Sequence, residues 1–322
     1  MKAKIIIVGS TGKLGVKLLK FCKKHKIEIF CITGYKNTNL LRKQSKYYRV
    51  KHAFALSIES ENKKFVKFLT YHSTDLIYFL DYGYFSITYA NIFLKRNKAS
   101  NIAIANKEMI IAGGFTLINK IKKTKNILIP LDSEHFSLIG SITSNKSLKK
   151  LYITASGGPF YSKKNINLDN VKLKKVLSHP KWKMGINNSI DSSNFINKIL
   201  EIFELSIIYE IDIKKIDFLI SPEAYVHSIV INNDNIVNIN CFVNNMLIPL
   251  LKPLEKIYPD ISLHNNSNFL NLKMLKLERF NDNRFKFFKF FNSFKRFNTN
   301  KQISFMILNN MAHKKYLSGD IE

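Results

Sequence analysis

The chain has 322 residues, of which 46% are hydrophobic, so it can bury a large core and form two or three domains. This composition excludes an intrinsically disordered protein. The formal net charge is +28, so the chain is expected to attract polyanions at low salt. Cys22, Cys31 and Cys241 are scattered without disulfide or metal-site spacing, which indicates a reduced protein.

The first predicted elements are a strand, a glycine-rich turn and a helix. An apolar run over residues 4–8 is followed by Gly9, Gly12 and Gly15 in G-x-x-G-x-x-G spacing, and then by an amphipathic stretch. Such glycines allow a tight turn, close approach of the backbone to a pyrophosphate, and close packing of helix on strand. A glycine motif alone is a weak signal, but its place directly after a strand favours nucleotide binding.

A second strand is predicted over residues 28–33, and the segment after it bears on cofactor choice. An NAD-specific protein would place a carboxylate there for the ribose 2′-hydroxyl, whereas this chain has Lys36 and Asn37, with Arg42 and Lys43 beyond. The missing acid and the cations favour NADPH over NADH. Lys36 also fits a solvated loop lysine in so lysine-rich a chain, so the missing acid is the stronger argument.

Two further strands are predicted over residues 101–105 and 127–131, each followed by polar residues. Lys107, Asp132 and Glu134 should project toward the cofactor crevice, because ligands bind at the carboxyl ends of strands in open α/β sheets. Asp132 and Glu134 are two positions apart and face the same way in extended chain, so with Glu201 they suit Mg²⁺ or Mn²⁺. The ordinary alternative for this pair is to cap the next helix. We expect His135 to be structural.

A strand over residues 151–154 precedes a glycine-rich turn at 155–160, which fits an anion site built on Ser156 or a plain turn. Further on, apolar spacing after Ser192 predicts a helix whose N-terminus lies near Ser192 and offers N–H groups to a phosphate. Asn197, Lys198 and Glu201 share or border one face of it. The alternative is a capped surface helix with a solvated Lys198–Glu201 pair.

Together these segments resemble the 1-deoxy-D-xylulose 5-phosphate reductoisomerase family. The resemblance runs from residue 4 to about residue 250. The matching segments are Gly9 to Gly15, Ala105 to Glu108, Pro130 to His135, Thr154 to Phe160, His179 to Gly185, Asp191 to Glu201, and Val226 to Val230.

The resemblance implies a role for each matching residue. Around NADPH it places Thr11, Gly12, Lys13, Leu14, Lys36, Asn37, Asn106, Glu108 and Gly185. For the divalent metal it implies Asp132, Glu134 and Glu201. For the substrate it implies Lys107, Ser133, Glu134, Ser156, His179, Ser192, Asn197, Lys198 and Glu201, with Ser156, Ser192, Asn197 and Lys198 at the phosphate. A closing flap would bring Trp182 over the substrate, although a buried core tryptophan is the alternative.

The implied activity is the conversion of 1-deoxy-D-xylulose 5-phosphate to 2-C-methyl-D-erythritol 4-phosphate in the non-mevalonate isoprenoid pathway, by skeletal rearrangement followed by reduction with NADPH. The expected fold is α/β, with a Rossmann-like doubly wound NADPH domain over residues 1–131 and a catalytic α/β domain over 132–250 that carries a flexible flap at 179–187. A linker over 251–270 and a shortened helical C-terminal domain over 271–322 follow. The family also implies a homodimer.

Several positions depart from the family pattern. Ile186 and Asn187 stand where a basic pair is usual, and Lys13 and Tyr35 replace small residues. The segment 81–84 stands where the family has a glycine-rich turn but contains only one glycine, Gly83. These changes bear on cofactor affinity and leave the metal and phosphate residues untouched.

The charge supports a rival class, a catalytically degraded basic Rossmann protein that binds nucleic acid or another polyanion. The densest basic and aromatic patch, residues 284–297, carries Phe287, Phe291 and Phe294 at helical spacing, which favours a core-facing stripe over a stacking platform. Enrichment in Lys, Asn, Ile and Phe also fits the A/T-rich genome of a reduced bacterial symbiont. We therefore expect no specific nucleic-acid partner.

Targeting signals are also not expected. Met1 and Lys2 lead directly into the first strand, with no room for a signal or transit peptide. The most apolar stretch, residues 76–94, is interrupted by polar residues and fits a strand, turn and helix better than a membrane span. We expect a cytoplasmic protein with no membrane partner.

Overall fold

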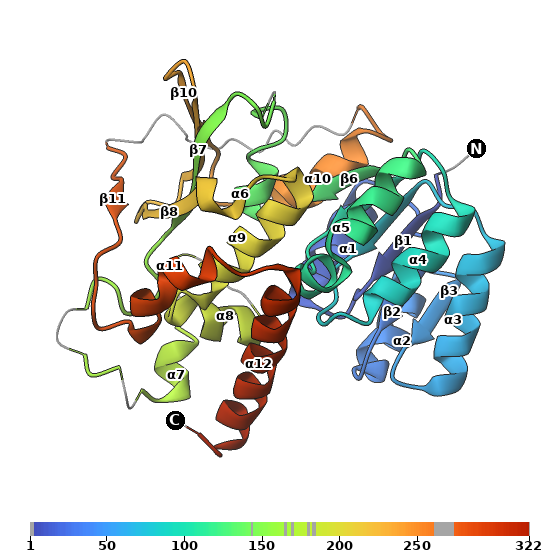
Figure 1. Cartoon of the computed structure of the whole chain (residues 1–322). Helices are drawn as coiled ribbons and strands as arrows, with labels where there is room; N and C mark the ends of the chain where they lie inside the picture. The colour runs from blue at the N-terminus through green and yellow to red at the C-terminus, as the bar shows by residue number, and fades with distance from the viewer. Residues whose placement is uncertain are drawn as a thin grey trace. The chain divides into compact units, whose positions relative to one another are not determined.

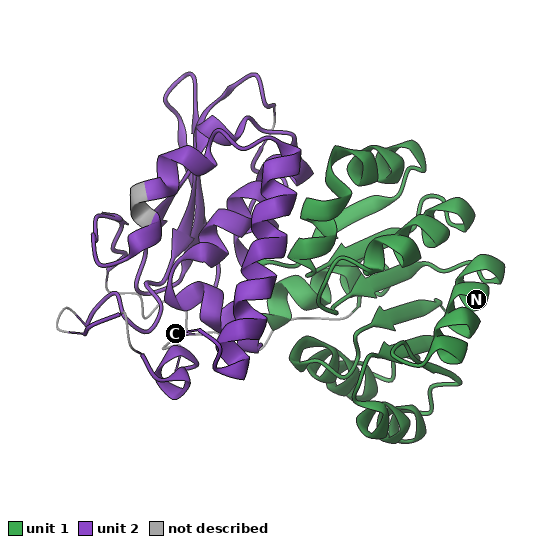
Figure 2. Cartoon of the chain, turned by 60° about the horizontal axis from the view of Figure 1, so that its bottom comes forward, with its two compact units in different colours: residues 1–132, 245–265 green, residues 133–244, 266–322 purple. Residues whose placement is uncertain are grey.

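The computed structural model describes residues 3–142, 144–163, 166–168, 171–178, 181, 185–260 and 274–321. The chain divides into two compact units (Figures 1 and 2). Unit 1 comprises residues 1–132 and 245–265, and unit 2 comprises residues 133–244 and 266–322.

Unit 1 is a doubly wound α/β fold. Its six strands are all parallel and pair in the order β3-β2-β1-β4-β5-β6. The strands are β1 (Ile5–Val8), β2 (Cys31–Gly34), β3 (His52–Ala55), β4 (Leu76–Phe79), β5 (Asn101–Ile104) and β6 (Ile127–Pro130). The helices are α1 (Lys13–Lys24), α2 (Thr38–Tyr48), α3 (Glu59–Tyr71), α4 (Ser86–Arg96), α5 (Lys107–Lys123) and α10 (Leu247–Glu255). Helices flank the sheet on both faces (Figure 2), which confirms the expected Rossmann-like class.

The topology of this sheet explains why β1 and β4 are apolar throughout and indicates the edge at which ligands bind. Residues of β1 and β4 are fully buried because helices cover both faces, so these strands read as continuous hydrophobic segments. The strand order reverses between β1 and β4, and ligands of such sheets bind at the carboxyl ends of the strands there. The strand predicted over 28–33 begins later, at Cys31.

The chain returns to unit 1 through α10. Leu250, Leu251 and Leu254 are buried in the same hydrophobic cluster as β1 and α1. The Tyr78 hydroxyl on β4 donates a 3.0 Å hydrogen bond to the Leu250 carbonyl. Unit 1 is therefore completed by a helix more than a hundred residues later in the chain.

Unit 2 is built on a mixed sheet in the order β10-β9-β7-β8-β11, in which only β7 and β8 are parallel. The strands are β7 (Leu148–Ala155), β8 (Ile216–Ile220), β9 (Val226–Asn232), β10 (Val237–Cys241) and β11 (Glu278–Arg279). The α-helices are α6 (Ser133–Phe136), α7 (Leu173–Val176), α8 (Ile186–Ser193), α9 (Ile196–Tyr209), α11 (Phe291–Phe294) and α12 (Thr299–Ser318), and the short 3₁₀ helices are η1 (Ile213–Lys215) and η3 (Lys286–Phe290).

The segment expected to begin one helix near Ser192 instead contains the end of one helix and the start of another. Ser192 lies in the last turn of α8, and α9 begins at Ile196. Phe195, between them, has a left-handed backbone with φ of 66° and is 2% exposed. The prediction of a helix N-terminus at Ser192 was wrong because Phe195 fits the apolar period of a helix, although its buried ring sits on a turn.

Several aromatic residues of the C-terminal segment pack inside unit 2. The ring of Phe195 lies 4.5 Å from that of Phe280 and 4.9 Å from that of Phe285, and Phe291 packs 5.2 Å from Phe218. These contacts support a core role for part of this phenylalanine-rich segment, whereas Phe290 is 60% exposed. None of the helices in the described ranges is both long and apolar enough to span a bilayer.

Candidate active site

The glycine turn after β1 is shaped by two glycines that no other residue can replace without movement. Gly9 has φ of +88°, and a Cβ added there would lie 2.6 Å from the Asp81 nitrogen. A Cβ on Gly15 would lie 2.5 Å from the Ser10 Cα. Gly12 differs, because the nearest atom to an added Cβ is 3.4 Å away. Gly9 and Gly15 thus allow close packing, and exposed Gly12 lets another molecule approach the backbone at the start of α1.

A buried hydrogen-bond network holds this turn. The Ser10 hydroxyl lies 2.8 Å from the Gln44 Oε1 and 3.0 Å from the Thr33 carbonyl, and the Gln44 Nε2 donates to the Ser10 carbonyl at 2.9 Å. Sequence reasoning missed Gln44. The only signal was a glutamine one turn after Leu41 on the apolar face of α2, where it is 4% exposed.

The residues that follow β2 are open to solvent. Lys36 and Asn37 are exposed, and the Asn37 side chain caps α2 by accepting a 3.1 Å hydrogen bond from the Leu40 nitrogen. Thr11 and Leu14 are partly exposed, and Lys13 is exposed at the first position of α1. These predicted cofactor residues follow the carboxyl ends of β1 and β2, the edge of the sheet at which ligands of this fold bind.

Asn106 uses its side chain within the protein. Its Oδ1 accepts from the Met109 nitrogen at 2.9 Å, while its Nδ2 donates to the Gly83 carbonyl at 2.9 Å and to Asp81 at 3.3 Å. Burial raises the pKa of Asp81, although hydrogen bonds from Ser86 and Asn106 oppose that rise. Asn106 therefore holds the turn after β4 against the start of α5. Glu108, in the first turn of α5, is also buried.

Two further predicted site residues of unit 1, Lys107 at the start of α5 and Asp132 after β6, form an ion pair. The Lys107 ammonium contacts the Asp132 carboxylate, and their side chains are 8% and 15% exposed. Asp132 ends the first segment of unit 1, and Glu134 is the second residue of unit 2. Covalent geometry alone keeps their Cα atoms within about 7 Å of each other.

Unit 2 contains a compact cluster of two carboxylates and one ammonium. The Lys198 Nζ on α9 lies 2.5 Å from the Glu134 Oε1 on α6 and 2.6 Å from the Glu201 Oε2 on α9. The three side chains are 9%, 12% and 2% exposed, respectively. Asn197 donates to Glu201, and Ser133 donates to Glu134. The cluster was expected as a solvated pair or a binding site, and its burial excludes the solvated alternative.

The chemistry of this cluster fits a divalent metal. The carboxylate oxygens of Glu134 and Glu201 lie within 4.8 Å of each other, and hard oxygen ligands are those preferred by Mg²⁺ and Mn²⁺. Two buried carboxylates this close repel each other unless positive charge lies between them. The Lys198 ammonium supplies that charge here, and a bound cation would share or take over its position.

His135 and Tyr209 fix the part of α9 that carries Glu201. The His135 Nε2 lies 3.0 Å from the Glu201 carbonyl, and the Tyr209 hydroxyl donates to the His135 carbonyl at 2.6 Å. Burial raises the pKa of Tyr209, and Glu204 raises it further, so its hydroxyl keeps its proton. His135 is fully buried, which supports the structural role expected from the sequence.

The two segments predicted to hold a phosphate lie side by side in unit 2. Gly158 has φ of +62°, and a Cβ there would meet the Ser192 carbonyl oxygen at 2.5 Å. The turn that contains Ser156 therefore packs directly on the last turn of α8. Arg284, another residue that sequence reasoning missed, supports this turn by donating to the Lys163 carbonyl at 2.6 Å and to the Tyr161 carbonyl at 3.2 Å.

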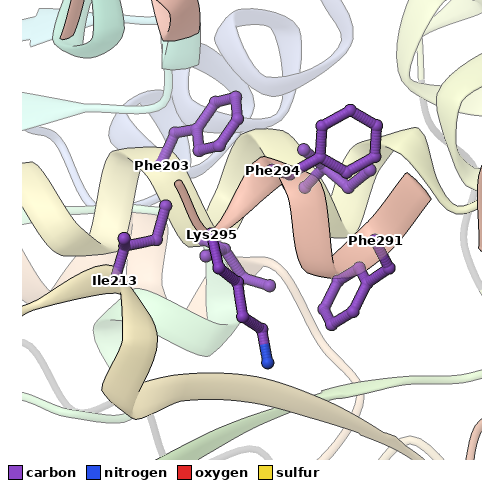
Figure 3. A pocket seen from close by; sticks show the side chains of 7 residues that line it. Phe203, Ile213, Phe291, Phe294 and Lys295 are labelled. Atoms are coloured by element: carbon purple, nitrogen blue, oxygen red, sulfur yellow. The ribbon is translucent and has the colours of Figure 1, made fainter. Parts of the chain in front are cut away.

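The opposite face of α9 is apolar. Phe203 of α9 lines a small recess with Ile213 and the α11 residues Phe291 and Phe294 (Figure 3). The recess has no room for a water molecule, so it is a packing surface. Helix α9 thus presents polar site residues on one face and is anchored by the other.

The flap prediction is only partly covered by the structure. His179 and Trp182 lie outside the described residues. Gly185 is exposed and caps the N-terminus of α8. The closing flap over residues 179–187 stays a prediction.

Comparison with known proteins gives a consistent result. Residues 128–209 match the family described as the 1-deoxy-D-xylulose 5-phosphate reductoisomerase C-terminal domain. The 1-deoxy-D-xylulose 5-phosphate reductoisomerase of Pelagibacter ubique is 35% identical over 307 residues, which cover 86% of this chain and 78% of that protein. The enzyme of the same name from Thermoanaerobacter pseudethanolicus is 32% identical over 290 residues, covering 84% and 75% of the two chains.

Solved structures share the fold. A crystal structure of DOX-P reductoisomerase in complex with NADPH, fosmidomycin and magnesium has a TM-score of 0.87 at 23% identity, and the match covers 99% of this chain and 86% of that one. The 1-deoxy-D-xylulose 5-phosphate reductoisomerase of Zymomonas mobilis in complex with NADPH has a TM-score of 0.81 at 21% identity, covering 100% and 88%.

Proposed function

Because this chain belongs to the 1-deoxy-D-xylulose 5-phosphate reductoisomerase family, we propose that it converts 1-deoxy-D-xylulose 5-phosphate to 2-C-methyl-D-erythritol 4-phosphate with NADPH and Mg²⁺ or Mn²⁺. The carbon skeleton is rearranged first, and the resulting aldehyde is then reduced by hydride transfer. This reaction belongs to the non-mevalonate route to isoprenoids. The observation that carries the proposal is the buried Glu134–Lys198–Glu201 cluster beside the start of α9.

In the proposed site, Asp132, Glu134 and Glu201 hold the metal. The buried Glu134 and Glu201 carboxylates support this role. Asp132 stands two positions before Glu134 in the chain, so the backbone keeps their Cα atoms close. A divalent cation bound there would polarise carbonyl and hydroxyl oxygens of the substrate and stabilise negative charge that develops on them. Lys198 and Lys107 each contact a carboxylate of this set, so they balance its charge and orient the oxygens.

The substrate phosphate is proposed to bind Ser156, Ser192, Asn197 and Lys198. The contact between Gly158 and the Ser192 carbonyl supports this set, because it brings the first two residues onto adjacent segments. A phosphate held there fixes one end of the substrate, and this remote binding orients the reacting carbons. Ser133 acts through its hydrogen bond to Glu134. His179 and Trp182 are proposed to close over the substrate and exclude water.

NADPH is proposed to bind along the carboxyl edge of the unit 1 sheet. Its pyrophosphate would approach the backbone at Thr11, Gly12, Lys13 and Leu14, and its 2′-phosphate would lie near Lys36 and Asn37. Exposure of Gly12 and of Lys36 supports this arrangement. Asn106 and Glu108 are proposed to act from the start of α5, and Gly185 from the flap.

We also propose a homodimer in the cytoplasm. Support for a second copy comes from β10, an edge strand of the unit 2 sheet on which Val237 and Ile239 are 51% and 50% exposed. Exposed apolar edges of this kind are suited to pairing with another chain. Analytical ultracentrifugation of the purified chain tests the association.

The experiment that tests the activity is NADPH oxidation by purified protein, followed at 340 nm, with the substrate present and with or without added Mg²⁺ or Mn²⁺. Substrate- and metal-dependent oxidation is the expected result. Failure to oxidise NADPH together with steeply salt-dependent nucleic-acid binding would instead favour the degraded polyanion-binding protein, for which the net charge of +28 is the supporting observation.

A further inference from the structure

The buried face of α12 is unusual because it is mainly polar. Its buried residues are Gln302, Met306, Asn309 and His313, which recur at helical spacing. Leu308 and Met311 of the same helix are 63% and 52% exposed. A helix that buries polar side chains and exposes apolar ones is held by specific hydrogen bonds more than by hydrophobic burial.

The partner of this polar face is Asp191 on α8. The Asp191 Oδ1 accepts hydrogen bonds from the Asn309 Nδ2 and from the His313 Nε2, each at 2.8 Å. Asp191 and His313 are each 4% exposed, and Asn309 is 8% exposed. The three side chains therefore form a buried carboxylate site with two donors, which come from more than a hundred residues further along the chain.

Asp191 lies directly before Ser192 in the last turn of α8. The Ser192 carbonyl oxygen is the atom against which Gly158 packs, so a shift of Asp191 would move both segments of the proposed phosphate site. Asp191 itself points to α12, so it acts on the site through the backbone it anchors.

We propose that His313 and Asn309 are positioning residues for the substrate phosphate site. They hold Asp191, and through it they set the position of Ser192 and of the Ser156 turn. The inference rests on the proposed function for the identity of the ligand. A buried carboxylate that loses its donors must regain them from water, which moves the last turn of α8 toward solvent.

The test compares His313→Leu with His313→Gln, because the glutamine amide can still donate near the position of the histidine Nε2. We expect His313→Leu to raise the KM for 1-deoxy-D-xylulose 5-phosphate about tenfold, as loss of a hydrogen bond to a charged group does, and to leave the NADPH dissociation constant within about twofold of wild type. His313→Gln should recover most of the lost affinity. Asn309→Ala provides a second variant if His313→Leu does not fold.

Met306→Ala is the matched control. Met306 lies on the same buried stripe and is 1% exposed, but its side chain cannot donate to Asp191. This variant loosens α12 without removing the hydrogen bonds. An equal rise in substrate KM in Met306→Ala, or an unchanged KM in both His313→Leu and Asn309→Ala, would overturn the inference.

Hydrogen–deuterium exchange separates this inference from the proposed function. His313→Leu should speed amide exchange in residues 189–198 relative to wild type and to His313→Gln, whatever the activity. Wild-type protein without turnover would reject the proposed function, and the exchange comparison would still decide whether α12 positions this segment. Exchange that is unchanged in His313→Leu would reject the positioning role.

Discussion

The glycine turn of unit 1 and the carboxylate cluster of unit 2 prepare for charged ligands in different ways. The turn at Gly9 to Gly15 offers backbone groups, and its shape depends on the absence of side chains. The cluster of Glu134, Lys198 and Glu201 offers side chains that already neutralise one another in part. Added atoms should therefore damage the first site, whereas removed charges should damage the second.

The largest expected effect comes from the side-chain site. Glu201→Gln removes one carboxylate of the proposed metal set and the negative charge paired with Lys198, and turnover should fall more than about a thousandfold, equivalent to ~4 kcal/mol in the barrier. The measurement is kcat in the NADPH oxidation assay, with circular dichroism to check the fold. Glu210→Gln, an exposed change at the end of the same helix, is the control. Full activity in Glu201→Gln would remove this residue from the site.

Lys198→Met tests whether a metal can replace the ammonium. Without Lys198, the carboxylates of Glu134 and Glu201 lose their shared counter-charge, and the metal-free protein should lose about 3 kcal/mol of stability. Added Mg²⁺ or Mn²⁺ should then raise the melting temperature more in the variant than in wild type. Lys295→Met, which breaks a 2.7 Å pair with Asp217 elsewhere in unit 2, should show no such metal dependence. Equal metal responses in the two variants would contradict the replacement.

Added methyl groups test the backbone site. Gly9→Ala should destabilise the protein by about 2 kcal/mol, because its Cβ would clash with the Asp81 backbone at a positive φ. Gly12→Ala meets no atom closer than 3.4 Å, so it should keep its melting temperature and instead weaken NADPH binding. Thermal unfolding and NADPH titration of the two variants give the comparison. Similar losses of stability in both would mean that Gly12 serves packing.

The smallest expected effect concerns cofactor choice. Lys36→Glu should lower the preference for NADPH over NADH about tenfold, since an acid there can accept from a ribose hydroxyl and repels a 2′-phosphate. Lys51→Glu makes the same charge change just before β3, at the amino edge of the sheet. The measurement is the dissociation constant of NADPH and of NADH for each of the two variants. An equal fall in the preference for NADPH in Lys51→Glu would show a general charge effect.

The two regions also differ in how far the sequence could predict them. The glycine turn is local, and its strand, turn and helix were expected from the spacing of Gly9, Gly12 and Gly15. The cluster joins Glu134 to residues 64 and 67 positions later, and the sequence linked Glu134 to Glu201 only by their shared suitability as oxygen ligands and by the resemblance to a family. Spacing within one helix placed Lys198 beside Glu201, but it could not show that Glu134 lies opposite.

Three features escaped prediction for physical reasons. Phe195 fits the apolar period of a helix, yet its left-handed backbone ends that period. Gln44 is a polar residue on an apolar face, so hydrophobic periodicity assigns it no role, although it holds the glycine turn. The buried stripe of α12 is polar, so hydrophobic patterning could not tell which face of that helix points inward.

The return of α10 to unit 1 has a consequence for synthesis on the ribosome. When residue 132 has left the exit tunnel, all six strands of the parallel sheet have been made, but Leu250, Leu251 and Leu254 have not. Domains that lie in one piece of chain can fold as they emerge. Until the insertion that follows β6 has been synthesised, part of the apolar surface of this nascent sheet stays exposed. Chaperones could bind that surface during this interval.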